Sequence, residues 1–200
     1  MTINAAYASS IQYRAVVGMT DTGQDADILT DLTAVSRYIE GKLRRFFNKD
    51  AAAVSRVYIP GENTIAIWVD DLAAAPTAIK LDTGRDGLFA TTLTATDYEL
   101  LPFNAIREPE PRPYTSISMT PWGKYSSFNE GERVQVTATF GWPAVPPAVQ
   151  RATIHLTAIL RLESPRATRR ISELAETIET SQDAQFIVKQ LVEQYKIWRV

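Results

Sequence analysis

The sequence contains no cysteine and only one histidine, His155. Without cysteine, disulfide bonds, thiolate nucleophiles and cysteine-based zinc sites are excluded. His155 has no second histidine with which to share a metal, and no G-x-S-x-G motif is present to support a Ser-His-Asp triad. Phosphate-binding loops of the GxxxxGK[ST] and GxGxxG types are also missing. We therefore expect no catalytic site, no metal and no cofactor.

An excess of one charge is also lacking. The 21 Lys and Arg residues nearly balance the 23 Asp and Glu residues, and the net charge is −2. A protein that grips DNA phosphates is usually strongly basic, so we do not expect a dedicated DNA binder, although DNA could pass near a local patch. No run approaches the ~18 apolar residues of a membrane span. The N-terminus has no signal-peptide pattern. The composition is that of a soluble globular protein.

Helical patterns lie at both ends of the chain. Residues 9–18 predict a short helix, and residues 24–47 predict a long amphipathic helix with Thr22 as its N-cap. In the long helix, acidic residues gather near the start and basic residues near the end, as the helix dipole favours. Residues 147–163, which begin after a proline-rich stretch, and residues 182–197 predict two further helices.

The middle of the chain is rich in β-branched and aromatic residues and predicts strands. Two such segments, VSRVYIP and NTIAIWVDDL, are separated by the turn residues 60–63, a pattern that predicts a hairpin. Apolar and polar residues alternate over 134–140, which indicates one buried and one wet face.

These patterns predict an α+β fold. We expect a small helical bundle made from the N- and C-terminal segments, with a β-rich insertion between the first long helix and the second. The predicted parts are an N-terminal helical part at 1–53, the insertion at 54–141, and C-terminal helices with a docking tail at 142–200. The two helical parts are expected to form one body.

Two groups of acidic residues are candidate chemical sites. Asp70 and Asp71 would point to opposite faces of a strand, so a turn or cap is favoured over a shared substrate site. The loop DTGRDG at 82–87 has some features of a calcium loop, but the twelfth position holds Leu93 instead of the required Glu. Neither group therefore predicts a metal or catalytic site.

Two other features suggest contacts with partners. Residues 161–170 include four arginines and only one glutamate. This excess of positive charge indicates either a solvated helix end or a patch for DNA or an acidic partner. These arginines are Arg161, Arg166, Arg169 and Arg170. Large apolar residues at the end of the chain must dock on the protein's own core or on a neighbour, and both remain open. That segment is Tyr195, Lys196, Ile197, Trp198, Arg199 and Val200.

Three segments together resemble the head–tail connector (adaptor) proteins of tailed bacteriophages and related gene-transfer particles. The first is the helix DADILTDLTAVSRYIEGKLRRFF, with Ile39, Glu40, Arg45 and Phe46 near its end. The second is DYELLPFNA, at 97–105. The third, VQVTATFGWPAVPPAVQRATIHLTAILRL, joins a strand ending in Phe-Gly-Trp to a helix through a Val-Pro pair. The resemblance spans most of the chain.

The resemblance implies a structural subunit that is not an enzyme. Such proteins form a ring, usually dodecameric, beneath the portal protein at the capsid vertex of the virion, and they assemble in the cytoplasm of the bacterial host. The ring prolongs the DNA channel without sequence-specific binding and offers a platform to the next connector or tail-terminator protein. In related connectors the C-terminal segment reaches the portal, which implies that role for Tyr195 to Val200. Neither a membrane nor a cofactor is implied.

Two other functions remain open from the sequence. One is a ligand- or carbohydrate-binding β module with flanking helices, in which Trp68, Trp122 and Trp142 form a stacking surface. Packing of these aromatic residues in the core or in loops is the favoured interpretation of the same residues. The other is a small enzyme that uses His155 and a carboxylate.

Overall fold

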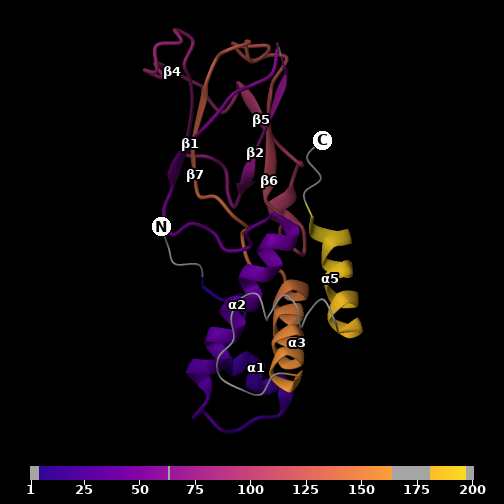
Figure 1. Ribbon diagram of the computed structural model, residues 1–200. Coiled ribbons are helices and arrows are strands. Elements are labelled where there is room, and N and C mark those ends of the chain that lie inside the picture. Colours follow the sequence, from indigo (N-terminus) through magenta and orange to yellow (C-terminus); the bar gives the residue numbers. More distant parts are fainter. Residues whose placement is uncertain (1–4, 63, 164–180, 197–200) are drawn as a thin grey trace. The chain divides into compact units, whose positions relative to one another are not determined.

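A computed structural model describes residues 5–62, 64–163 and 181–196. The chain divides into two compact units, a helical unit made from both ends of the sequence and a β unit, Asn48–Ala144, made from its middle (Figure 1). Antiparallel sheets occupy the β unit, and the described helices of four residues or more lie in the helical unit. The predicted α+β class is therefore confirmed, with a helical body drawn from both ends of the chain and a β-rich insertion between its first long helix and the second.

The described helices are α1 (Ser10–Val17), α2 (Asp25–Leu43), α3 (Pro147–Glu163) and α5 (Gln182–Tyr195). α1 begins with a capping box, in which the Ser9 hydroxyl accepts from the Gln12 backbone N–H and the Gln12 side chain bonds to the Ser9 N–H. It ends at Gly18, which takes the left-handed conformation with φ 72°. The predicted short helix therefore agrees with the structure to within a residue at each end.

The predicted start of α2 at residue 24 agrees with Asp25 to within a residue, but its predicted N-cap and its predicted C-terminal end are wrong. Gln24 occupies the N-cap position without a side-chain bond, and Thr22 contributes only its backbone carbonyl, 3.1 Å from the Asp25 nitrogen. The helix stops at Leu43, four residues earlier than predicted, because Arg44 adopts a left-handed backbone with φ 52°. Helical periodicity continues through Phe46 in the sequence, so it does not reveal this early end.

The core of the helical unit lies between α1, α2 and α3. Tyr13 of α1, Ile28 and Leu32 of α2, and Ile154 of α3 form one buried cluster. α3 also buries threonine side chains, and the Thr153 hydroxyl donates to a carbonyl four residues back at 2.8 Å. This bond satisfies a buried polar group without a partner from another helix.

The strands form two antiparallel sheets. One has the order β1-β7-β3-β4 and the other has the order β2-β6-β5. Their bounds are β1 (Val54–Tyr58), β2 (Ala66–Leu72), β3 (Ala78–Leu81), β4 (Thr91–Thr92), β5 (Tyr98–Leu101), β6 (Tyr114–Met119) and β7 (Val134–Ala138). Apolar side chains from both sheets form a single buried cluster, so the sheets share one core.

The predicted hairpin between the first two strands is wrong. β1 pairs with β7, from Val54 opposite Ala138 to Tyr58 opposite Val134, whereas β2 pairs with β6. The turn residues after β1 carry the chain from one sheet to the other instead of reversing it within one sheet. β2 buries Ile67, Val69 and Leu72 in the shared core, whereas Val54 and Val57 of β1 are exposed and only Tyr58 of β1 packs against that core. The β-branched pattern of β1 therefore predicts a strand but not its partner. The alternation predicted over 134–140 is confirmed, since Val134, Val136, Ala138 and Phe140 are buried.

The segment Phe140-Gly141-Trp142 joins three parts of the β unit. The carbonyl of Phe140 accepts from the Asp50 N–H at 2.8 Å, and the Gly141 N–H donates to the Asp71 carbonyl at 2.7 Å. The indole N–H of Trp142 donates to the Asp71 carboxylate at 3.1 Å. This segment thus fixes the end of β2 and the entry of the chain into the β unit.

Gly141 allows this close approach, and it gives a test. Its φ is +110°, and an added Cβ would lie 2.1 Å from the Asn48 carbonyl oxygen. We expect Gly141→Ala to lower the free energy of unfolding by roughly 3 kcal/mol or more, through overlap with backbone and a strained dihedral. Gly61→Ala is the control, because nothing lies within 4 Å of its added Cβ. Urea unfolding measures both, and equal stabilities would contradict the prediction.

Candidate interaction site

A buried polar cluster ties the N-terminal segment to the end of α2. The Tyr7 hydroxyl donates to the Glu40 carboxylate and accepts from the Phe47 N–H at 3.1 Å. The Tyr7 N–H donates to the Ser36 hydroxyl at 3.0 Å, and Arg37 pairs with Glu40 at 2.8 Å. Desolvation raises the pKa of Glu40 above its ordinary value, although the bonds from Tyr7 and Arg37 oppose it.

The same cluster fixes the end of α5. The Phe47 ring contacts Tyr7 and Tyr195 edge-on, with ring centroids 5.6 and 5.5 Å apart. The Tyr195 carbonyl accepts from the Arg45 guanidinium at 3.0 Å. Tyr195, the first residue of the predicted tail contact, is therefore buried in the helical unit's own core.

The remainder of the predicted tail leaves from this point. Lys196 is half-buried and follows α5 as its C-cap, with its N–H bonded to the Val192 carbonyl at 3.2 Å. Ile197, Trp198, Arg199 and Val200 lie outside the described residues. The segment proposed for partner binding thus follows a helix end that is packed in the core of the helical unit.

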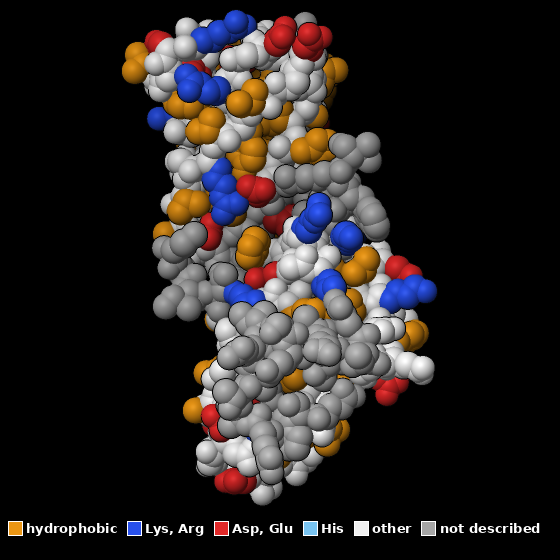
Figure 2. Space-filling model, viewed as in Figure 1, with side chains coloured by type: hydrophobic (Ala, Val, Ile, Leu, Met, Phe, Trp, Pro, Cys, Tyr) orange, Lys and Arg blue, Asp and Glu red, His pale blue; other side chains and the backbone are white. Residues whose placement is uncertain are grey.

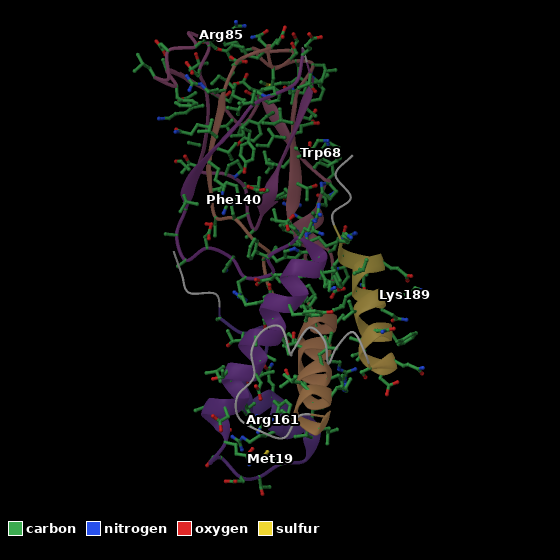
Figure 3. The ribbon with its side chains drawn as sticks, viewed as in Figure 1. Met19, Trp68, Arg85, Phe140, Arg161 and Lys189 are labelled. Carbon is green, nitrogen blue, oxygen red and sulfur yellow. The ribbon has the colours of Figure 1, made fainter. Side chains whose placement is uncertain are left out.

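The predicted arginine patch is described at one position only. Arg161 lies on α3 (Figure 3), and its guanidinium is 2.6 Å from the Asp31 carboxylate and also donates to Gln24. Its side chain is 20% exposed, so it links α3 to the start of α2. Arg166, Arg169 and Arg170 lie outside the described residues.

The adjacent acids Asp70 and Asp71 serve the fold. Both lie within β2, so their interpretation as a turn or cap is wrong. Asp70 accepts from the Arg56 guanidinium at 2.9 Å and the Tyr58 hydroxyl at 3.0 Å, whereas Asp71 accepts from Trp142. Their different partners agree with the expectation that the two carboxylates face opposite ways.

The loop that begins at Asp82 is organised around that buried carboxylate. Asp82 accepts from the backbone N–H groups of Asp86 at 3.0 Å and Gly87 at 3.1 Å, and it pairs with Arg133 at 2.7 Å. Burial alone would raise its pKa, but these donors together lower it. Among the described residues no group of three His, Asp or Glu side chains is placed to hold a metal. His155 is exposed on α3.

The three tryptophans weighed as a stacking surface do not share one. Trp142 is 2% exposed, whereas Trp68 and Trp122 are each 73% exposed. Figure 3 marks the position of Trp68. Core packing is thus confirmed for Trp142 and wrong for Trp68, which stands on the outer side of β2. A stacking surface that includes Trp142 is excluded by its burial, and this weakens the carbohydrate-binding alternative.

A basic surface at the end of α2 was missed from the sequence. Lys42 and Arg44 are exposed, Arg45 is half-buried, and the Phe46 ring is 58% exposed. A signal existed, because residues 41–49 contain four cations and no acid. The helix dipole alone accounts for basic residues near a helix C-terminus, so this run of cations did not stand out as a separate surface.

No helix in the described parts of the chain is long and apolar enough to cross a membrane.

Comparison with solved structures gives two relevant likenesses. A chain in the neck of an empty gene transfer agent (GTA) particle, computed with C6 symmetry, has a TM-score of 0.54 and 20% identity, over 97% of this chain and 91% of that one. A chain in the virion of a native GTA particle has a TM-score of 0.50 and 21% identity, over 100% of this chain and 97% of that one. No family model matches the chain, and no curated protein matches it. At these identities the likeness shows a shared fold over almost the whole chain.

The polar cluster predicts a specific loss of stability. Tyr7→Phe removes the hydroxyl that serves both Glu40 and the Phe47 N–H, and it leaves two buried polar groups without that partner. We expect the free energy of unfolding to fall by about 1–3 kcal/mol. Tyr98→Phe is the matched control, because that half-buried hydroxyl has no bonding partner among the described residues. Thermal unfolding checks both, and equal losses would contradict the prediction.

Glu40 predicts a dependence of stability on pH. Its folded pKa is raised from 4.5, so the native state binds its proton more tightly than the unfolded state. The stability that Glu40 contributes is therefore full below pH ~4.5 and falls as the pH rises through the folded pKa. We expect the stability of wild type relative to Glu40→Gln to decrease between about pH 4 and pH 7. Unfolding free energies across this range measure it, and a constant or rising difference would refute it.

Proposed function

We propose that this protein is a structural head–tail connector (adaptor) subunit that forms a ring beneath a portal protein. The observation that carries the proposal is the fold shared with chains of the GTA neck and virion over at least nine-tenths of each chain. A likeness confined to one unit would suggest a common module, whereas this one includes both the helical unit and the β insertion. The role is structural, without catalytic chemistry.

The symmetry of the neck supports a ring. The neck that contains the similar chain was computed with C6 symmetry, so that chain occurs in repeated copies around an axis. A subunit in such a ring must present surfaces to identical neighbours, and apolar and arginine side chains are favoured there. The proposed ring, dodecameric in the connectors that the sequence resembles, prolongs the DNA channel and supports the next connector or tail-terminator protein.

Two contacts follow from this role. Residues 196–200 contact the portal, and the burial of Tyr195 against Phe47 gives that segment a fixed starting point. Because Asp31 already engages Arg161, the proposed patch for DNA or an acidic partner is made by Arg166, Arg169 and Arg170. DNA passes this patch without sequence-specific contacts, as the near-neutral net charge of −2 suggests.

The proposal is tested on particles. We expect the chain to be present in purified particles, to be located at the head–tail junction by immunogold labelling, and to be retained by immobilised portal protein. Absence from particles together with failure to bind the portal would overturn the proposal. A monomer in solution would not, because a ring can assemble on the portal.

Deletion of residues 197–200 separates the tail from the fold. We expect the change in unfolding free energy to be below about 1 kcal/mol, because Tyr195 keeps its packing against Phe47. Portal retention should be lost. Tyr195→Ala is the contrasting variant, since it removes a buried ring and should lower stability by about 3 kcal/mol. A tail deletion that retains portal binding would contradict the assignment of the tail.

A further inference from the structure

The end of α2 combines positive charge with an exposed aromatic ring. Lys42 and Arg44 are exposed, and the Phe46 ring beside them is 58% exposed. Arg and aromatic side chains are the residues most enriched at protein interfaces. A purely phosphate-binding surface has no use for an exposed phenyl ring, so the combination favours a protein partner. We call this surface the basic end.

Arg44 also has an unfavourable backbone. Its φ of 52° lies in the left-handed region, at the position after a helix where glycine is preferred. A residue with a side chain loses stability there relative to glycine. Within the described residues the Arg44 side chain makes neither a hydrogen bond nor an ion pair that would offset this loss. The fold would therefore gain from glycine at this position, and the side chain is available for an external contact.

The opposite end of the helical unit has complementary properties. Residues 19–31 contain four acids and no base. Arg14 and Arg161 neutralise Asp25 and Asp31, but Asp21 and Asp27 are exposed. Figure 2 shows acidic side chains at this end. Exposed apolar side chains, Val17 and Leu29 among them, lie near these acids in α1 and the first turns of α2. We call this surface the acidic end.

We propose that the basic end of one copy docks on the acidic end of a second copy. The pairing of the two ends does not depend on the proposed function. Only the closure of the paired copies into a ring rests on it. Arg44 lies 17 residues after Asp27 along the same region of helix, about 26 Å at 1.5 Å per residue, so the two ends cannot meet within one chain. Charge and apolar surface match between the ends. The two ends are different surfaces, so the contact is head-to-tail and propagates from copy to copy.

Cross-linking tests the pairing directly, because the chain has no cysteine of its own. Ala26→Cys marks the acidic end and Gly41→Cys marks the basic end, and both sites are exposed and leave the charges intact. The two single-cysteine variants, made distinguishable by an affinity tag, are mixed at millimolar concentration with a short bismaleimide. We expect the yield of the 26–41 product to exceed the yields of the 26–26 and 41–41 products at least fivefold. A mixture of Gly41→Cys with His155→Cys is the control, and the 26–41 yield should exceed the yield of its mixed product by the same factor. Equal yields, or predominance of a like-with-like product, would overturn the proposal.

Charge reversal identifies the cause of any cross-link. Lys42→Glu with Arg44→Glu should reduce the 26–41 product at least fivefold, as should Asp21→Lys with Asp27→Lys. All four changes in one chain should restore most of the product, because every contact again joins opposite charges. If the fourfold variant stays low while it remains folded by circular dichroism, the electrostatic pairing is refuted.

Arg44→Gly distinguishes a contact residue from a structural one. We expect a higher melting temperature, because the left-handed strain is relieved, together with a lower yield of the 26–41 product. A change at Arg44 that lowers both would assign Arg44 to the fold and overturn its interface role. These experiments need only the purified chain, so their outcome is independent of portal binding. A chain that binds the portal without a 26–41 product would overturn this inference and leave the proposed function standing.

Discussion

The buried bond between Tyr7 and Glu40 is the interaction on which the helical unit most depends. A carboxylate is costly to bury, and Glu40 is kept there by the Tyr7 hydroxyl and the Arg37 guanidinium. The Tyr7 oxygen also receives the Phe47 N–H, which holds the chain just after the left-handed turn of α2. Phe47 in turn supports the last residue of α5, Tyr195. The proposed contacts of the basic end and of the tail both start from this one cluster, so loss of Tyr7 would loosen them together.

Several buried acids of the β unit do similar work. Asp82 organises its loop through backbone amides and Arg133, and Asp97 accepts from the Thr94 N–H at 2.7 Å and the Lys124 N–H at 2.9 Å. Asp71 holds Trp142. Donors from the same chain occupy these three carboxylates, and for Asp82 and Asp97 they lower the pKa of the side chain. Acidic residues that are candidates for a chemical site in the sequence thus have a structural role, because their carboxylates accept hydrogen bonds from nearby backbone and side-chain donors.

The sequence predicted the local secondary structure, but it did not predict which strands pair or which side chains meet across the fold. The range of α1, the start of α3 after a proline-rich stretch and the alternation in β7 are decided by neighbouring residues, and all three agree with the structure. The pairing of β1 depends on which strand arrives from about 80 residues away, and the turn signal after Tyr58 could not decide it. The exposure of Trp68 and the pairing of Arg161 with Asp31 are also long-range facts. For the candidate site, the run of cations after Gly41 was visible, but the left-handed Arg44 that exposes it was not.

Interaction surfaces are best sought at side chains that make few stabilising contacts within their own chain. Tyr195 and Arg161 looked like surface contacts, yet both are engaged internally, so their removal would report on folding before it reported on binding. Arg44 and Phe46 are the reverse case, one in an unfavourable backbone and one an exposed ring. A left-handed arginine that makes no bond within the described part of the chain fits the external contact proposed for it. A subunit of a closed ring needs such surfaces, because each copy in isolation leaves half of every interface unfilled.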